Sequence, residues 1–246
     1  MSLLETKKLT KSFGGLTAVD NVNFEVAKGE LRAIIGPNGA GKTTFFNLIA
    51  GRLAPTEGEI WFKGENITHI PPYHITKKGI GRSYQVTNIF PKLTVFENVR
   101  LAAQAMETTF NFWQDVTFME DVNTRVVGIL EKLKLTEHKD VRAVNLSHGL
   151  QSHLEIGIAL ASHPELLLLD EPTAGMTEEE TERMMELIDE ISKGVTIVLV
   201  EHDMKFVMTL SKKITVLHEG KVLAEGPPEE IRNNEEVQRV YLGKKE

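Results

Sequence analysis

The stretch GPNGAGKTT, residues 36–44, decides the fold expected of this 246-residue chain. It matches the pattern G-x-x-x-x-G-K-[ST] in full. The apolar run Leu31–Ile35 before it predicts a buried strand, and residues 42–50, followed by Gly51, predict a helix. Strand, glycine-rich loop and helix in this order are the context that a phosphate-binding loop requires.

The residue types in this loop suit a bound phosphate. Glycines let the backbone curl so that successive N–H groups, together with the positive end of the following helix, converge on an anion. We expect Lys42 to reach the β- and γ-phosphates of a nucleoside triphosphate, and the Thr43 hydroxyl to bind Mg²⁺. The predicted nucleotide-binding residues of the loop are Gly36, Pro37, Asn38, Gly39, Ala40, Gly41, Lys42, Thr43 and Thr44.

Length and composition narrow the class of protein. The chain is long enough for one well-buried α/β domain. Its formal net charge of −7, without a stripe of lysine and arginine, argues against a nucleic-acid partner. It has no cysteine, which excludes disulfide scaffolds and thiolate metal sites. Apolar runs such as Val195–Val200 are far shorter than the ~18 residues of a membrane span, so we expect a separate subunit to hold the chain at any membrane.

Short strand-like runs predict two kinds of sheet. Three runs near the N-terminus alternate with turns and predict an antiparallel sheet: residues 3–9, 22–26 and 59–63. Three near-continuous apolar runs predict a parallel core covered on both faces: residues 31–35, 166–169 and 195–200. Residues 214–217 and 221–224, joined through Glu219-Gly220, predict a late hairpin.

Acidic and imidazole side chains follow two of the predicted core strands. Asp170 and Glu171 come after residues 166–169, and His202 comes after residues 195–200. The carboxyl ends of strands in an α/β sheet border its ligand crevice. We expect Asp170 to hold Mg²⁺, Glu171 to orient or deprotonate the attacking water, and His202 to sense the γ-phosphate. Alone, such acids are more often a solvated strand end and such a histidine is more often structural; the phosphate loop favours the catalytic interpretation.

Taken together, these motifs resemble the nucleotide-binding domain of ABC transporters, and the likeness runs essentially from end to end. The resemblance implies that Phe13 in KSFGG stacks on adenine. It implies that Gln85 in GRSYQ is a catalytic glutamine that contacts Mg²⁺ and forms a hinge toward a helical insertion. It also implies that Ser147 and Gly149 in LSHGLQ belong to a signature that touches the ATP of a partner subunit.

The resemblance further implies a fold. This is an α/β P-loop NTPase (RecA-like) core with an antiparallel β subdomain and an inserted helical subdomain, in one ABC ATPase domain over residues 1–246. The expected boundaries are 1–91 and 163–225 for the nucleotide-binding core with its β subdomain, 92–162 for the helical subdomain with the signature, and 226–246 for a C-terminal helical tail.

The expected assembly follows from the same family. Two subunits, identical or related paralogues, close head to tail around two ATP molecules with Mg²⁺. The expected location is the cytoplasmic face of the inner cell membrane, peripheral to integral-membrane permease subunits. A periplasmic or extracellular solute-binding protein would act indirectly through those permeases.

A narrower likeness concerns the transported solute. FFNLIAG, IFPKLTVFENV, VLHEGKVLAEG and the final VYLG resemble ATP-binding subunits of importers for branched-chain amino acids and, closely related, urea. We favour ATP hydrolysis coupled to amino-acid import over import of urea or another small solute. A soluble ABC ATPase of translation or DNA repair is opposed by the lack of a second cassette or of a coiled-coil or zinc insertion. A nucleotide-gated module that switches without turnover is opposed by Glu171 and His202.

The signature departs from the family pattern at two positions. His148 and Leu150 stand where glycine and glutamine are usual. Ser147 still suits a helix N-cap. With leucine at the third helical position, the reciprocal side-chain bond of a capping box is unavailable, and we expect Gln151 to substitute in part.

Two further departures flank the predicted catalytic strand. Ser152 and His153 stand where related importers carry basic residues, which weakens the positive field toward the partner's phosphates and predicts slow basal turnover. Thr177 stands where many relatives place an aspartate. With Glu180 it predicts a capping box at a helix start.

Overall fold

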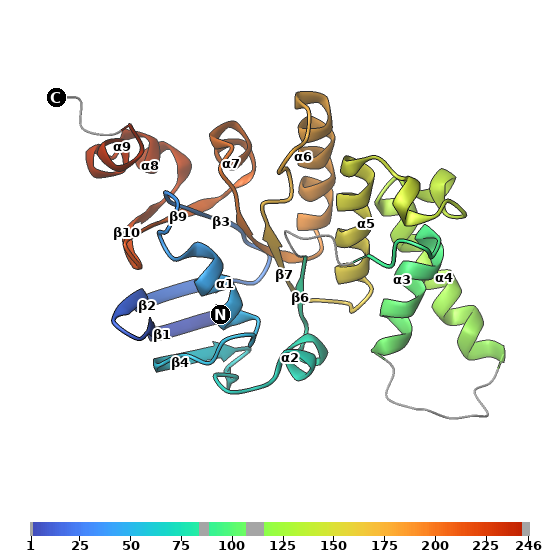
Figure 1. The fold of residues 1–246 in the computed structure, drawn as a ribbon, viewed down its shortest axis with the longest axis horizontal. Helices are drawn as coiled ribbons and strands as arrows, with labels where there is room; N and C mark the ends of the chain where they lie inside the picture. Colours follow the sequence, from blue (N-terminus) through green and yellow to red (C-terminus); the bar gives the residue numbers. More distant parts are fainter. Residues whose placement is uncertain (1, 84–88, 107–115, 243–246) are drawn as a thin grey trace.

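Two β-sheets and the helices around them make up the described part of the chain (Figure 1). The structure is a computed structural model. It describes residues 2–83, 89–106 and 116–242, without the side chains of residues 116–119 and 242. Both predicted sheets are present.

The antiparallel sheet has the strand order β2-β1-β4-β5. Its strands are β1 (Ser2–Phe13), β2 (Leu16–Ala27), β4 (Glu57–Phe62) and β5 (Glu65–Asn66). The first two extend well beyond the predicted runs because they form one long hairpin, in which Ser2 lies opposite Ala27 and Phe13 opposite Leu16.

The second sheet has the strand order β10-β9-β3-β8-β7-β6. Its strands are β3 (Leu31–Ile35), β6 (Ile80–Arg82), β7 (Leu166–Asp170), β8 (Thr196–Val200), β9 (Lys213–His218) and β10 (Lys221–Gly226). Neighbouring strands are parallel except in the predicted hairpin of β9 and β10. The parallel core therefore contains β6 and β9 in addition to the three predicted strands.

The register of the parallel strands brings their carboxyl ends to one edge. Ile34 of β3 and Asp170 of β7 both lie opposite Val200 of β8. The segments that follow these three strands consequently leave the sheet side by side, where open α/β sheets bind their ligands.

Helix α1 (Lys42–Ile49) lies between the two sheets (Figure 1). Its Phe45 and Phe46 are buried with apolar residues of both sheets. The opposite face of the parallel sheet packs against helices, among them α5 (His148–Leu160), α6 (Glu178–Ser192) and α7 (Met204–Leu210). Leu167 faces these helices and Leu168 faces α1, as expected from the alternation of side chains along a strand.

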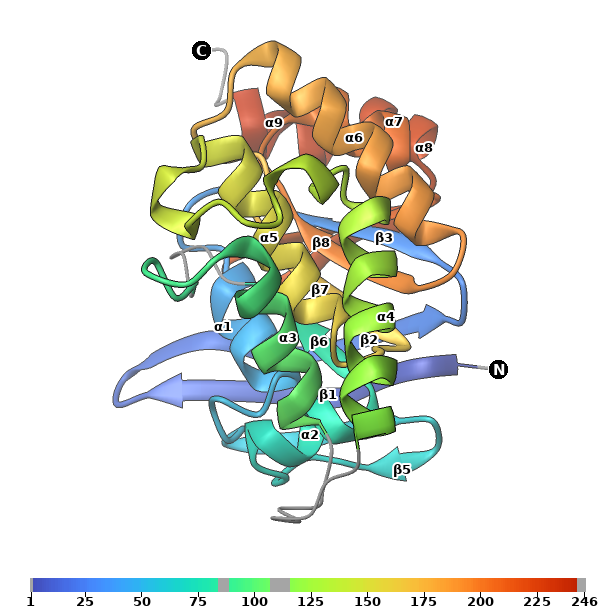
Figure 2. The same cartoon turned by 90° about the vertical axis from the view of Figure 1, so that its right-hand side faces the viewer.

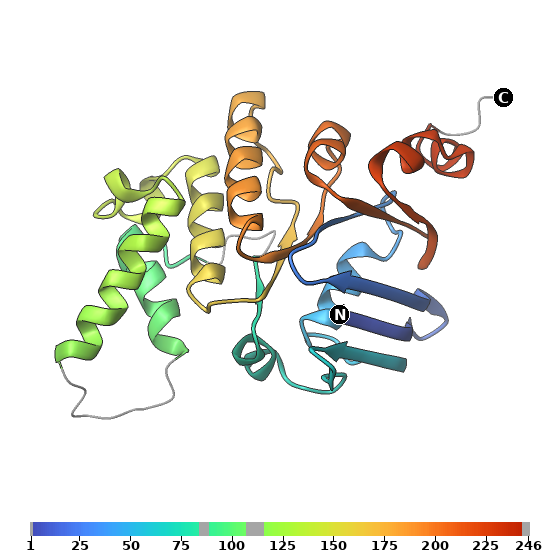
Figure 3. The same cartoon turned by 180° about the vertical axis from the view of Figure 1, so that it is seen from behind.

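Helices occupy most of the predicted insertion. They are α3 (Val95–Ala105), α4 (Val116–Lys132) and α5, with 3₁₀ turns at Thr136–His138 and Ala143–Asn145. Figures 2 and 3 show α3 and α4 at the end of the molecule away from the antiparallel sheet. The boundaries of the subdomains stay a prediction.

The predicted C-terminal tail contains two helices, α8 (Pro228–Asn233) and α9 (Glu235–Leu242). Asn234 separates them because its side-chain oxygen accepts bonds from the backbone N–H groups of Glu236 and Val237, and so starts a new helix. A short helix that the sequence pattern did not indicate, α2 (Pro72–Lys78), precedes β6. Among the described helices, none combines the length and apolar character that crossing a membrane requires.

Candidate nucleotide-binding site

The predicted phosphate loop joins the end of β3 to the start of α1. Asn38 and Gly39 are exposed at its tip, whereas Ala40 and Lys42 are buried. The Ala40 carbonyl accepts a hydrogen bond of 3.1 Å from the N–H of Gly220, in the turn between β9 and β10. The base of the loop is therefore anchored while its tip is open to a ligand.

Two glycines of the loop are required by close approaches of the backbone. A Cβ atom on Gly36 would lie 2.2 Å from the carbonyl oxygen of Leu217. One on Gly41 would lie 2.3 Å from the carbonyl oxygen of Ala18, and Gly41 also has a left-handed φ of +99°. Larger residues would push the loop away from β9 or β2.

Lys42 places its ammonium inside the curl of the loop. Its Nζ donates to the carbonyl oxygens of Gly36 at 2.6 Å and Pro37 at 3.0 Å, and the residue is 6% exposed. Burial lowers the pKa of Lys42, and the nearby carboxylates of Glu171 and Asp170 counteract this. The ammonium of Lys42 and the carboxylates of Asp170 and Glu171, at the end of β7, are thus close enough to affect one another, as the sequence predicts.

Asp170 ends β7 in a buried position and is paired with a residue that sequence reasoning missed. Its Oδ2 accepts a bond of 3.0 Å from Arg82 of β6, which also donates to Asn47 of α1 at 2.8 Å. Burial raises the pKa of Asp170, and the charge of Arg82 counteracts the shift. Arg82 lies within the GRSYQ segment, but only the pairing of β6 with β7 brings it to Asp170.

The donor groups here suit the Mg²⁺ ion that the loop motif implies. Asp170 Oδ1 is buried and has no hydrogen-bond partner among the described residues. The side chain of Thr43 is exposed in the first turn of α1. Since Mg²⁺ is usually held by one or two carboxylates together with substrate phosphates, an aspartate and a hydroxyl beside a phosphate loop fit this ion.

Glu171 and His202 lie in direct contact. The distance between Glu171 Oε1 and His202 Nε2 is 2.6 Å. Because a carboxylate only accepts hydrogen bonds, we assign the proton of this contact to Nε2. Glu171 has a left-handed φ of +50°, which is uncommon outside glycine and occurs at functional sites. The backbone N–H of Glu171 donates a hydrogen bond of 2.9 Å to the carbonyl oxygen of Val200, and this bond holds the backbone at Glu171 against the end of β8.

Glu201 is a second residue that sequence reasoning missed. It is 3% exposed, and its carboxylate accepts bonds from the N–H of Thr173 at 3.0 Å, the Thr173 hydroxyl at 2.6 Å and the N–H of His202 at 3.0 Å. It therefore ties the segment after Glu171 to the backbone that carries His202. The EHD sequence contains Glu201, but nothing in the sequence shows that it points inward.

Phe13 and Tyr241 are aromatic residues from opposite ends of the chain. Phe13, predicted to stack on adenine, is 46% exposed at the end of β1, and Lys11 Nζ lies 5.2 Å from its ring centre. Tyr241 of α9, which sequence reasoning assigned only to an amphipathic helix, lies beside the backbone of Gly36. Burial raises the pKa of Tyr241 to about 12.

The predicted signature forms the start of α5. Ser147 is its N-cap and accepts a bond of 3.4 Å from the N–H of Leu150. Gly149 is buried, and a Cβ atom there would lie 2.9 Å from Glu180 Oε1 at the start of α6. Gln151 donates to the carbonyl oxygens of Ala143 and Leu146, so it does not supply the missing bond to the N-cap backbone.

The start of α6 and His153 of α5 were also the subject of predictions. The predicted capping box is confirmed: Thr177 accepts from the N–H of Glu180 at 3.3 Å, and Glu180 accepts from the N–H of Thr177 at 3.0 Å. His153 is only 8% exposed, with its Nδ1 3.1 Å from the carbonyl oxygen of Leu133. The ring of His153 therefore lies in the interior and is not part of a surface that could face a partner's phosphates.

The residues predicted to bind phosphate and to catalyse hydrolysis lie at one edge of the sheet. This edge brings together Lys42, Thr43, Asp170, Glu171 and His202, and can hold a polyphosphate, a divalent cation and a water molecule. Ser147 and Gly149 belong to a separate part of the fold: Figure 1 shows β7 and α6 between α1 and α5. Gln85 lies outside the described residues.

Comparisons with known proteins agree with this site. The family model described as "ABC transporter" matches residues 19–174, and the model described as "Branched-chain amino acid ATP-binding cassette transporter" matches residues 221–246. The chain is 41% identical to the high-affinity branched-chain amino acid transport ATP-binding protein LivG of Escherichia coli K12, over 98% of each chain. It is 39% identical to the corresponding protein BraF of Pseudomonas aeruginosa, also over 98% of each chain.

A solved structure shares the whole fold. The ADP conformation of an ATP-binding cassette of an ABC transporter superimposes with a TM-score of 0.88 at 30% identity, covering 99% of this chain and 100% of that one. The predicted P-loop NTPase fold with an antiparallel sheet is thereby confirmed.

Proposed function

The chain belongs to the ABC transporter family, and from this premise we propose that it binds and hydrolyses ATP to energise an importer of branched-chain amino acids. The observation that carries the proposal is the contact of Glu171 with His202 beside the phosphate loop. The choice of solute rests on the relatives LivG and BraF and on the family model that matches residues 221–246.

ATP binding is assigned to the loop and the aromatic residue before it. The backbone N–H groups of residues 36–44 surround the phosphates, Lys42 contributes its charge, and Phe13 stacks on adenine. Thr43 and Asp170, with Gln85, hold Mg²⁺, which neutralises charge on the phosphates when it is bound.

Hydrolysis is assigned to the pair at the strand ends. Glu171 accepts a proton from the attacking water or orients it toward the γ-phosphate. His202 keeps the Glu171 carboxylate in place through its Nε2 proton, and its proposed second role is to sense the γ-phosphate. Glu201 positions Glu171 and His202 because its carboxylate bonds to the backbone segments that carry them.

The proposed working unit is a head-to-tail pair of ATPase subunits, either identical or paralogous. Ser147 and Gly149 of one subunit would complete the nucleotide site of the other, which suits their separation from the loop within one chain. A dimeric ATP-binding cassette bound to ADP and Pi, 29% identical to this chain with a TM-score of 0.78 over 92% of it, supports such pairing.

The proposed location is the cytoplasmic face of the cell membrane, in contact with permease subunits. The permeases and a solute-binding protein outside the membrane would select the solute. Gln85, near the helical insertion, is the proposed hinge between nucleotide and permease.

The test is a transport assay with the chain assembled with its permeases in proteoliposomes. We expect ATP-dependent uptake of radiolabelled leucine, stimulated by the liganded binding protein and lost in Lys42→Ala. Uptake of urea but not leucine would assign the alternative solute. Phosphate release without any uptake would reject coupling to import, and no phosphate release would reject the ATPase itself.

A further inference from the structure

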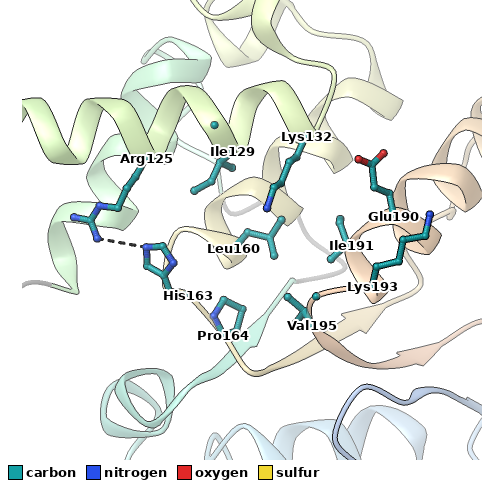
Figure 4. Close-up of a pocket in the computed structure, with 12 residues that line it drawn as sticks. Arg125, Ile129, Lys132, Leu160, His163, Pro164, Glu190, Ile191, Lys193 and Val195 are labelled. Carbon is teal, nitrogen blue, oxygen red and sulfur yellow. Dashed lines mark hydrogen bonds between the residues drawn. The ribbon is translucent and has the colours of Figure 1, made fainter.

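A cavity lies at the edge of the parallel sheet opposite the phosphate loop. It is lined by residues of α4, by the end of α5 and the segment before β7, and by the end of α6 with the segment before β8 (Figure 4). Strands β7 and β8 each have five residues, so this edge is separated from Glu171 and His202 by about 16 Å at about 3.3 Å per residue.

The walls of this cavity are mainly apolar. Its volume is about 730 Å³, within the range of cavities that hold small organic ligands. Ile129, Leu160, Ile191 and Val195 lie around its centre (Figure 4). Ile129, Leu160 and Val195 are only partly buried, so they offer apolar surface that the fold itself does not cover.

The charged side chains around these walls are mostly cationic. Arg125, Lys132 and Lys193 line the cavity with a single carboxylate, Glu190. Lys193 pairs with Asp189 at 3.2 Å, and Arg125 lies 3.4 Å from the ring of His163. Within the described ranges Lys132 makes no ion pair, and Figure 4 shows its side chain reaching over the apolar floor.

Gly128 gives independent support for a ligand at this position. It lies inside α4, where glycine is less favourable for a helix than alanine. A Cβ atom on Gly128 would meet nothing within 4 Å, so neighbouring atoms do not require a glycine. A larger side chain at this position would project from the lining of the cavity and reduce its space.

We propose that this cavity binds an aliphatic carboxylate, with its hydrocarbon body on the apolar walls and its carboxylate at Lys132. Burial of the hydrocarbon supplies the affinity, and the excess of cations selects an anion over a neutral or cationic molecule. Fatty acids share this chemistry with leucine and its oxo acid. The site is independent of the proposed ATPase function, because its residues are not those that bind nucleotide.

The ligand would also connect two parts of the fold. Ile129 and Lys132 belong to the helical insertion, whereas Ile191 and Val195 belong to α6 and the approach to β8. A molecule in contact with both would stabilise their arrangement, and the temperature of unfolding would rise with the logarithm of its concentration above Kd.

The test is titration of the full chain with decanoate, followed by calorimetry and by the unfolding temperature. We expect saturable binding with Kd below about 1 mM. Lys132→Glu, and separately Gly128→Leu, should weaken binding at least about tenfold, which corresponds to about 1.4 kcal/mol. Lys139→Glu makes the same charge change, and Val127→Leu enlarges an exposed neighbour of Gly128 in the same helix. Neither residue lines the cavity, so neither change should have an effect.

Further titrations identify the source of the ligand. Competition of decanoate by leucine or 4-methyl-2-oxopentanoate would assign an amino-acid-derived ligand, and binding of decanoate alone would assign a fatty acid. Absence of saturable binding by all three overturns the proposal. So does equal affinity for decylamine, or binding that Lys132→Glu and Gly128→Leu leave unchanged. Affinity for ATP should be the same in every variant, so the outcome does not depend on the nucleotide site.

Discussion

At the scale of single residues, the proposed catalytic arrangement depends on backbone conformations that few residue types tolerate. Glu171 has a left-handed conformation, and Gly36 lies against the Leu217 carbonyl with no room for a Cβ atom. The first feature aims a carboxylate toward His202, and the second lets the loop curl close to β9. Strain and close contact are therefore found where the chemistry is proposed.

Replacing Glu171 tests whether this carboxylate acts in hydrolysis. Glu171→Gln keeps the shape but loses the base, so we expect ATP to bind normally, steady-state phosphate release to fall by at least about 100-fold, and ATP to trap a dimer. Size-exclusion chromatography with MgATP and a phosphate-release assay measure this. The exposed Glu186→Gln serves as control, and a purely monomeric Glu171→Gln with ATP would count against the mechanism.

Adding one methyl group at Gly36 tests the close approach. In Gly36→Ala the new Cβ must displace the loop from Leu217, so we expect affinity for a fluorescent ATP analogue to fall by more than about tenfold, or about 1.4 kcal/mol. Gly15→Ala is the matched control, because a Cβ there meets nothing within 4 Å. Unchanged affinity in Gly36→Ala would show that the loop adapts.

At the scale of elements, the N-terminal caps of α5 and α6 and the buried ring of His153 help to position these helices. Ser147 caps α5 and the Thr177–Glu180 box caps α6, so these ends are defined by local bonds. His153 then fixes α5 to the end of α4 through the Leu133 carbonyl. Since a carbonyl only accepts, the neutral ring donates from Nδ1.

The buried His153 makes stability depend on pH. Burial lowers its pKa below the ordinary value of 6.5. The unfolded chain therefore binds a proton first as the pH falls, so the contribution of His153 to stability is complete above 6.5 and is lost progressively below it.

We expect urea unfolding of the wild type to show this loss between pH 7.5 and 5.5, with a slope from this residue of at most about 1.4 kcal/mol per pH unit. His153→Gln cannot titrate and should lose less stability over the same interval. The exposed His69→Gln controls for general effects of acid. Parallel curves for wild type and His153→Gln would contradict the assignment.

At the scale of the whole molecule, the proposed nucleotide site draws on segments from both ends of the chain. β1 supplies Phe13, the middle of the chain supplies Asp170 and Glu171, and α9 brings Tyr241 to the first glycine of the loop. The C-terminal helix therefore supports the loop directly.

Removing the hydroxyl group of Tyr241 tests this support. Tyr241→Phe keeps the ring and removes the hydroxyl beside the Gly36 backbone. If this hydroxyl supports the loop with the strength of one hydrogen bond, about 1 kcal/mol, ATP affinity should fall by about fivefold. Titration with a fluorescent ATP analogue measures the change, and Tyr73→Phe, exposed on α2, is the control. Equal affinity in both variants would mean that α9 does not influence the loop.

The features predicted from the sequence were those with local causes. GPNGAGKTT requires glycines for its own curl, the apolar runs of β3, β7 and β8 indicate buried strands, and Thr177 with Glu180 indicates a cap. Asp170, Glu171 and His202 could be placed at one edge because parallel strands share a direction.

Only the tertiary structure decided which distant residues meet. Arg82 reaches Asp170 because β6 pairs with β7, Glu201 turns inward to Thr173, and Tyr241 lies beside Gly36. Neither charge nor periodicity in the sequence predicts these contacts, because they depend on strand order and on the packing of helices onto the sheet. The sequence thus determined the loop, the strands and the identity of the acids, while the three-dimensional fold determined the partners that hold them in place.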